Sequence, residues 1–223
     1  MSVFYMKDKG YSFKYQGLNE EIEIPAIREE LAPYLAEKRQ GEYTVEDYNA
    51  LPEEERVELI DGVLYDMAAP EAGHQGIADE IWQVFNLFIK KKKGKCFAIT
   101  SPLSVQLDCD NRTMVQPDVL IVCDRSKFQR GIVFGVPDLV VEVLSPSTRK
   151  RDLMLKLRKY RAAGVWEYWL VDPKHRQVIV HRFQENPQTK FYTFEEKVPV
   201  GIFDGECMVD FKEIYDYVGF LYE

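Results

Sequence analysis

The chain has 223 residues, of which 46% are hydrophobic and 30% are charged, and its formal net charge is −8. These proportions are typical of a globular protein, and an acidic total argues against a protein that coats nucleic acid by bulk charge. No run approaches the roughly 20 apolar residues that cross a bilayer, and the N-terminal residues lack the apolar core of a secretory signal. We therefore expect a cytoplasmic location and no membrane partner.

The spacing of the cysteines also favours a cytoplasmic location. Cys96, Cys109, Cys123 and Cys207 are scattered along the chain, and no two of them form a CxxC pair. This spacing predicts neither a zinc site nor a disulfide framework. A reducing cytoplasm is the simplest setting for such a sequence.

The composition and hydrophobic patterning of the chain change near residue 43. Residues 1–42 are acidic and weakly patterned, and we interpret them as an N-terminal appendage to one domain over residues 43–223. The run TVEDYNAL predicts a short helix with Thr44 as its cap, because acidic residues fill its first turn. The run RVELIDGVLYDMA predicts two strands around Asp61-Gly62, a strong hairpin signal.

Helix-like and strand-like segments alternate along the rest of the chain. HQGIADEIWQVFNLFIKKKK predicts an amphipathic helix that ends near Gly94, and PDLVVEVLS predicts a strand buried on both faces. STRKRDLMLKLRKYRAAGV predicts a helix that ends at Gly164, followed by a buried strand in EYWLVDP and an edge meander in QVIVHRF and KFYTFEE. This order predicts an α/β or α+β fold with a mixed sheet flanked by helices.

Glu142 is out of place, because it lies between two valines in an apolar strand. A buried lone carboxylate costs several kcal/mol unless a cation, a metal ion or hydrogen bonds compensate it. Asp118 begins another predicted strand and could meet Glu142 across a strand pair, where two carboxylates can hold Mg²⁺. Asp138 lies about 13 Å along the same strand from Glu142, so we expect it to make a turn or strand-entry contact. The alternatives for Glu142 are a structural ion pair or a strand-end carboxylate that faces water.

Lys156 is the second charge within an apolar segment. On a helical wheel Leu153, Leu157 and Tyr160 form one face, and Lys156 lies on its flank. A lysine so placed should direct its amine toward the sheet, where it could stabilise negative charge that develops on a phosphate. The alternative is that its stem lies along apolar surface while its amine reaches solvent.

Several of these runs together resemble the Uma-type restriction endonucleases of the PD-(D/E)XK nuclease superfamily. The runs are QPDVLIV, PDLVVEVLSPSTRKRD, K-x-x-x-Y and GVWEYWLVDP, with YTVEDYNALPEEERVELIDGVLYDM and GHQGIADEI before them. The resemblance covers residues 43 to about 215. It implies a restriction-endonuclease-like core with a divalent-metal site, Mg²⁺ or Mn²⁺, on Asp118 and Glu142.

The resemblance also implies roles for further residues. The superfamily keeps a lysine two residues after the acid, where this chain has Leu144, and in such families the next helix supplies it, which Lys156 matches. Glu58 matches a family acid and could be a third metal ligand, or it could be a solvated hairpin residue. His74 matches a family histidine that could equally be a helix cap or a supporting contact, and Gln116 could orient the site.

These residues predict a metal-dependent endonuclease that hydrolyses DNA through Asp118, Glu142, Lys156 and Glu58. Two basic runs, at 149–161 and 90–95, are either solvated helix faces or cationic surfaces that steer nucleic acid. Two alternatives are an inactive relative that binds nucleic acid or protein through the same fold, and a structural dimer whose buried charges form ion pairs. A homodimer could use the C-terminal meander near Trp166, Tyr168 and Trp169.

Overall fold

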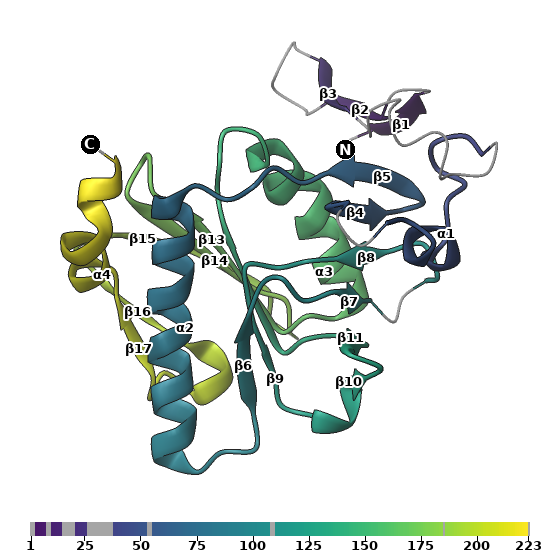
Figure 1. The fold of residues 1–223 in the computed structure, drawn as a ribbon. Coiled ribbons are helices and arrows are strands. Elements are labelled where there is room, and N and C mark those ends of the chain that lie inside the picture. Colours follow the sequence, from purple (N-terminus) through teal and green to yellow (C-terminus); the bar gives the residue numbers. More distant parts are fainter. Residues whose placement is uncertain are drawn as a thin grey trace. The chain divides into compact units, whose positions relative to one another are not determined.

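The chain forms two compact units in this computed structural model (Figure 1). The first comprises Met1–Ala68 and Gln106–Val115, and the second comprises Ala69–Val105 and Gln116–Glu223. The boundary at residue 43 between an appendage and a nuclease domain stays a prediction. The structure describes residues 3–7, 10–14, 21–25, 38–52, 55–107, 110–184 and 186–222.

The first unit contains a three-stranded antiparallel sheet, a short helix and a hairpin. The helix α1 follows Thr44, whose backbone N–H donates to Asp47 Oδ2 at 2.7 Å, as the capping signal predicted. The hairpin turns at Asp61 and Gly62, whose φ angles of 54° and 77° suit a two-residue turn. The elements are β1 (Val3–Lys7), β2 (Gly10–Lys14), β3 (Glu21–Pro25), α1 (Val45–Asn49), β4 (Val57–Ile60), β5 (Val63–Asp66) and β8 (Met114–Val115); β7 (Val105–Gln106) lies at the boundary of the two units.

A six-stranded mixed sheet in the order β15-β14-β13-β12-β9-β6 is the centre of the second unit. β12 and β13 run parallel, and the other neighbours are antiparallel. Every residue of β12 and β13 is buried, which confirms the strands predicted as buried on both faces. The sheet consists of β6 (Phe97–Thr100), β9 (Val119–Val122), β12 (Leu139–Val143), β13 (Glu167–Asp172), β14 (Gln177–Arg182) and β15 (Gln188–Thr193). The second unit also contains β10 (Phe128–Gln129), β11 (Ile132–Phe134), β16 (Lys197–Pro199) and β17 (Met208–Asp210), which lie outside this sheet.

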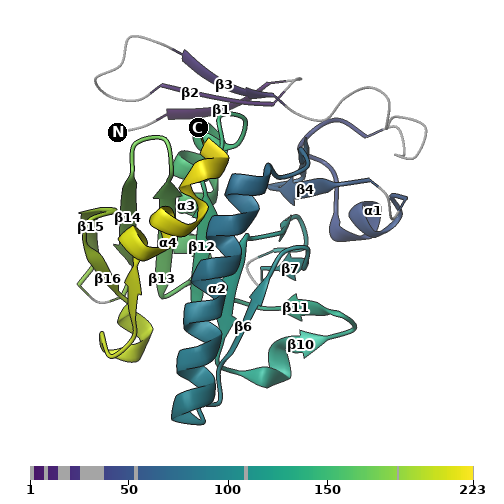
Figure 2. The same cartoon turned by 60° about the vertical axis from the view of Figure 1, so that its left-hand side comes forward.

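Helices cover both faces of this sheet. The long helix α2 and the C-terminal helix α4 lie side by side over one face, where they share an apolar core with the strands (Figures 1 and 2). The segment that carries Lys156 lies over the other face, and its Tyr160 ring packs on Tyr168 of β13. α2 ends at Lys92, and its C-cap Lys93 adopts the left-handed conformation, one residue before the predicted Gly94. The helical segments are α2 (Ala72–Lys92), η2 (Arg125–Lys127), η3 (Arg151–Lys156), α3 (Leu157–Ala163), η4 (Gly201–Phe203), α4 (Phe211–Val218) and η5 (Gly219–Tyr222).

One sequence prediction is wrong in this unit, the absence of a disulfide. Cys96 and Cys123 form a disulfide, because β6 and β9 pair with Phe97 opposite Val122 and so place the two cysteines at the next position. Tyr168 and Trp169 are fully buried inside the unit, and a dimer through the neighbouring C-terminal meander stays a prediction. No helix within the described residues combines the length and apolar character needed to span a membrane.

Candidate metal site at the ends of strands β9 and β12

Asp118 and Glu142 come together because β9 and β12 are antiparallel neighbours. Val141 pairs with Val119, and one further step of this register places Glu142 opposite Asp118. The Asp118 carboxylate also accepts a hydrogen bond from the backbone N–H of Val143 at 2.7 Å. The sequence predicted this cross-strand meeting, and the register agrees with it.

Glu142 is buried, with only 3% of its surface exposed, and two donors from the helical segment reach one of its oxygens. Lys156 Nζ lies 2.9 Å from Glu142 Oε1, and the Tyr160 hydroxyl donates to the same oxygen at 2.8 Å. Neither a glutamate that faces water nor a lysine that reaches solvent fits this burial, because Lys156 is also 3% exposed. The two charges that looked misplaced in the sequence therefore form a buried ion pair.

The lysine reaches the glutamate from a π-helical stretch, η3. A π-helix has more residues per turn than an α-helix, and such stretches occur frequently at functional sites. Its wider turn changes which side chains face the sheet: Asp152, Leu155 and Lys156 are buried, whereas Leu153 is only half-buried. Of the face drawn for an ideal α-helix, only Tyr160 is fully buried, and Leu153 and Leu157 are both half-buried.

Asp152 is a member of this cluster that the sequence reading missed. Its side chain is 1% exposed, and Oδ1 lies 3.6 Å from Lys156 Nζ, so the ammonium lies near two carboxylates. Its backbone carbonyl accepts a hydrogen bond from the Tyr168 hydroxyl at 3.1 Å. The available signal was its place as the one acid in the basic run 149–161.

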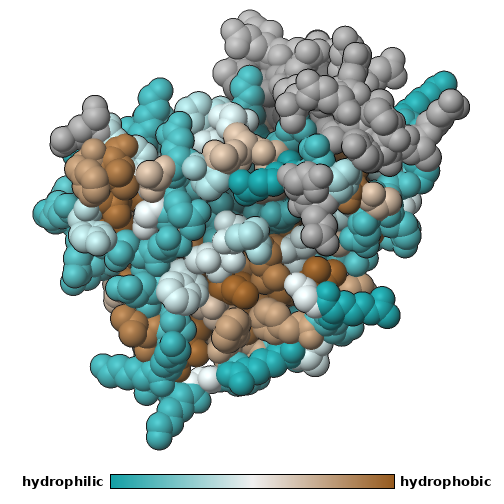
Figure 3. Space-filling view, viewed as in Figure 1, coloured by the Kyte–Doolittle hydropathy of each residue, from teal (hydrophilic) through white to brown (hydrophobic). Residues whose placement is uncertain are grey.

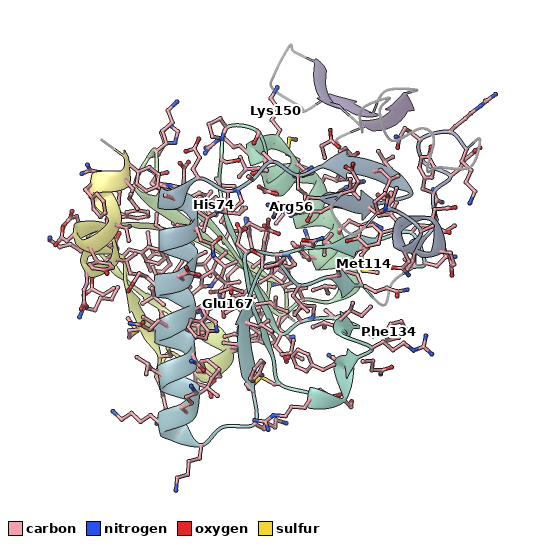
Figure 4. The ribbon with its side chains drawn as sticks, in the orientation of Figure 1. Arg56, His74, Met114, Phe134, Lys150 and Glu167 are labelled. Atoms are coloured by element: carbon pink, nitrogen blue, oxygen red, sulfur yellow. A yellow bond between two sulfur atoms is a disulfide. The ribbon has the colours of Figure 1, made fainter. Side chains whose placement is uncertain are left out.

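His74, in the first turn of α2, contacts the other carboxylate (Figure 4). Its Nε2 lies 3.2 Å from Asp118 Oδ2. Burial alone would lower the pKa of His74, but the hydrogen bond and charge of Asp118, the Val143 carbonyl and the charge of Asp152 together raise it. The histidine therefore contacts Asp118, in line with the alternative of a supporting contact.

Asp138 makes the strand-entry contact that its position predicted. Its Oδ2 accepts a hydrogen bond from the backbone N–H of Cys123 at 2.7 Å. Continuing the β9–β12 register places Asp138 opposite Val122 rather than opposite an acid. This second Pro-Asp dipeptide therefore belongs to the strand pair and not to the carboxylate pair.

Two further predicted residues, Glu58 and Gln116, lie outside the contacts described so far. Glu58, on β4 of the first unit, is fully buried, which rules out a solvated hairpin residue. Because it belongs to the other unit, its participation in the site stays a prediction. Gln116 is half-buried and precedes Asp118 by two residues.

The basic run 149–161 is less of a solvated face than its composition suggests. Arg151, Lys156 and Lys159 are buried, and Arg149 forms an ion pair with Asp172 at the end of β13. Lys150 is exposed and projects away from the fold (Figure 4). The segment therefore uses several of its charges to attach itself to the sheet.

The donors at this end of the sheet fit a divalent cation of the Mg²⁺ type. Three carboxyl groups, of Asp118, Glu142 and Asp152, accompany the Lys156 amine and the His74 imidazole, so acidic groups outnumber basic ones in the cluster. Mg²⁺ is commonly bound by one or two carboxylates and completes its shell with water and substrate phosphate oxygens. Within the described residues no three His, Cys, Asp or Glu side chains lie close enough to hold an ion by themselves. A bound ion would therefore depend on ligands from water and substrate.

Comparison with solved structures shows the fold. A crystal structure titled as a putative nuclease belonging to DUF820, from Anabaena variabilis, is similar with a TM-score of 0.65. The alignment covers 78% of this chain and 98% of that one at 24% identity. The fold is thus restriction-endonuclease-like, with mixed sheets flanked by helices, as the sequence predicted.

Comparison of sequences adds a relative and a family. The curated "Uncharacterized protein slr1290" of Synechocystis is 32% identical over 106 residues, which are 48% of this chain and 54% of the relative. The chain therefore matches about half the length of that relative. The family model described as "Putative restriction endonuclease" matches residues 45–203, more than half of the chain. The chain therefore belongs to this family, Uma2.

Proposed function

We propose that this chain is a metal-dependent endonuclease that hydrolyses phosphodiester bonds of DNA. The observation that supports the proposal most strongly is the buried cluster at the ends of β9 and β12, where Lys156 lies 2.9 Å from Glu142 and the strand register places Glu142 opposite Asp118. Paired carboxylates beside an ammonium are suited to phosphoryl chemistry, because one part binds a cation and the other stabilises negative charge. The family match agrees with a nuclease.

Each residue has a proposed part in the reaction. Asp118 and Glu142, with Glu58 as a further candidate, would hold Mg²⁺ or Mn²⁺, which supplies Lewis-acid polarisation of the scissile phosphate. Lys156 would place its ammonium beside the charge that develops on the phosphate. Tyr160 and Asp152 orient the carboxylate and the ammonium through the contacts described above.

The direct test is a plasmid-nicking assay with Mg²⁺ and with Mn²⁺. Glu142→Gln and Lys156→Met should each abolish nicking, because one removes a metal-binding charge and the other removes the ammonium. Glu195→Gln, an exposed acid outside the cluster, is the matched control and should cleave normally. Metal-dependent cleavage that survives both cluster substitutions would contradict the assignment of the site.

A second candidate function is a nuclease-fold protein without activity that binds nucleic acid or another protein. The finding that favours it is the lack of a three-residue metal cluster within the described part of the chain. The two functions differ in a thermal-shift experiment, since an ion that binds only the native state raises the melting temperature. A rise with Mg²⁺ that Asp118→Asn abolishes supports the enzyme, and an unchanged melting temperature supports the binding module.

Compartment and assembly complete the proposal. We place the protein in the cytoplasm, where DNA is accessible, although the disulfide between Cys96 and Cys123 is of a kind that is rare in that compartment. A homodimer remains part of the proposal, with the exposed edge strand β15 as its candidate surface, since all but one of its residues are exposed. Size measurement in solution tests this assembly.

A further inference from the structure

Basic side chains gather at the end of the second unit where α2 finishes. Five lysines lie between residues 90 and 95, and all of them are exposed. The segment 125–134, which forms η2 and the β10–β11 hairpin, contains Arg125, Lys127 and Arg130 and no acid. Its hairpin turns at Arg130 and Gly131, which carries the Arg130 side chain at an exposed tip.

Specific contacts bring these two basic segments together. The Arg125 guanidinium donates from Nε to the carbonyl of Lys95 at 2.8 Å, and the disulfide between Cys96 and Cys123 joins the same two stretches. Asp124 lies between them, and hydrogen bonds from Ser126, with smaller contributions from the charges of Lys127 and Lys95, lower its pKa. The lysines of α2 and the cations of the hairpin therefore form one surface.

Aromatic side chains lie within this basic surface. Phe97 on β6 is 46% exposed and contacts Phe128 of the hairpin edge-on, with ring centroids 5.7 Å apart. Phe134 on β11 is 41% exposed. Figure 3 shows apolar side chains over β6, β10 and β11, with hydrophilic side chains around them. Exposed aromatic rings among cations are the pattern on which single-stranded nucleic acids bind, with phosphates on the cations and bases on the rings. The cations alone can bind the phosphates of a duplex, whose bases are already stacked.

We propose that this surface, the α2 end and the β10–β11 hairpin, binds the phosphate backbone of a nucleic acid away from the cleavage site. The inference rests on the proposed nuclease function and adds to it a second point of contact with the substrate. His74 beside Asp118 and Lys92 at the basic end lie 18 residues apart on α2, or about 27 Å at 1.5 Å per residue. That length corresponds to roughly eight base pairs of duplex.

Because the chain has a net charge of −8, we expect a polyanion to bind at this basic surface and not over the whole protein. A uniformly acidic surface repels a polyanion, so a local basic patch fixes where the strand can approach. Lys92 is partly neutralised by an exposed ion pair with Glu206 at 2.6 Å. Lys95, Arg125 and Arg130 are therefore the better cations to change.

The test compares two triple variants in a fluorescence-anisotropy titration with a 30-base-pair DNA duplex, without metal so that cleavage does not interfere. Lys95→Ala/Arg125→Ala/Arg130→Ala should weaken binding about tenfold or more at 0.1 M salt and lower the slope of log affinity against log salt by about 2 to 3. Lys174→Ala/Lys197→Ala/Lys212→Ala removes the same charge from exposed positions elsewhere and should leave both quantities unchanged. Circular dichroism of both variants confirms folding.

The results for DNA binding at the basic surface can be distinguished from those for the proposed nuclease activity. Loss of binding in the first variant, with or without DNA cleavage by the parent protein, supports the surface. An unchanged affinity and salt slope in that variant overturns it, even if Mg²⁺-dependent nicking is observed. Binding of the parent to phosphatidylserine vesicles but not to DNA would also overturn it, because the basic patch would then recognise a lipid surface.

Discussion

Asp118 and Asp138 make the same contact from opposite ends of one strand pair. Asp118 accepts from the N–H of Val143 and Asp138 from the N–H of Cys123, each at 2.7 Å. Each aspartate follows a proline and precedes its own strand, so the antiparallel pair relates them by an approximate two-fold axis. They differ in what lies opposite, since the register gives Asp118 a glutamate and Asp138 a valine.

Because the two aspartates make the same contact, replacing either one should lower the free energy of unfolding by a similar amount. Asp118→Asn and Asp138→Asn should each lower the free energy of unfolding by about 1 kcal/mol, because a neutral amide oxygen still accepts the backbone N–H but binds it less strongly than a carboxylate. Urea denaturation of both variants measures this loss. A difference between them well above 1 kcal/mol would show that the two contacts are not equivalent.

The ion pair between Lys156 and Glu142 should be far more sensitive to the loss of one partner than of both. Lys156→Met leaves a buried carboxylate without its cation and should cost about 3–5 kcal/mol. Adding Glu142→Gln should recover part of that loss, since it removes the nearer of the two carboxylates that Lys156 faces. A double-mutant cycle by chemical denaturation measures the coupling. Simple additivity of the two changes would contradict a direct pair.

The sequence could predict the fold and the pairing of Asp118 with Glu142 because both depend on local patterns. Continuous valine and leucine runs identified β12 as a buried strand, and a charge within such a run has to be compensated. Asp118 could be matched to Glu142 because strands that pair place their residues about 5 Å apart. These expectations needed only strand periodicity.

Other parts of the site depend on geometry that periodicity does not encode. The π-helical turn of η3 rotates Asp152 toward Lys156, whereas an α-helical wheel turned Leu153 inward. The disulfide depends on the register of β6 with β9, which brings together two cysteines 27 residues apart in the sequence. Non-local pairing of this kind could not be predicted from spacing alone.

Asp172 predicts an acid-dependent contribution to stability. Burial would raise the pKa of Asp172, but hydrogen bonds from Arg149 and His175 lower it below its usual 3.8. A carboxylate with a lowered pKa stabilises the folded state above its unfolded pKa, and the contribution is lost as pH falls through the folded value. Asp172→Asn should therefore cost about 1 kcal/mol at pH 7, a difference that should shrink as pH falls below 3.8 through the lowered folded-state pKa. Denaturation at several pH values measures it, and a constant difference would contradict the assignment.

The disulfide between Cys96 and Cys123 closes a loop whose ends are 27 residues apart. Loop-closure entropy predicts that reduction, or the change Cys96→Ser/Cys123→Ser, lowers the free energy of unfolding by about 3 kcal/mol. Calorimetry with and without reductant measures the effect. The buried Cys207 is the control, since Cys207→Ser should not alter the response to reductant. An equal melting temperature in both conditions would show that the pair does not form a disulfide.

The central claim is that Asp118, and not its two-fold counterpart Asp138, holds the catalytic ion. The most direct measurement is the rate of Mg²⁺-dependent plasmid nicking by Asp118→Asn and by Asp138→Asn, at a temperature where circular dichroism shows both variants folded. We predict that Asp118→Asn loses at least a hundredfold in rate, whereas Asp138→Asn stays within a few fold of the parent protein. Equal rates in the two variants, or a greater loss in Asp138→Asn, would contradict the account.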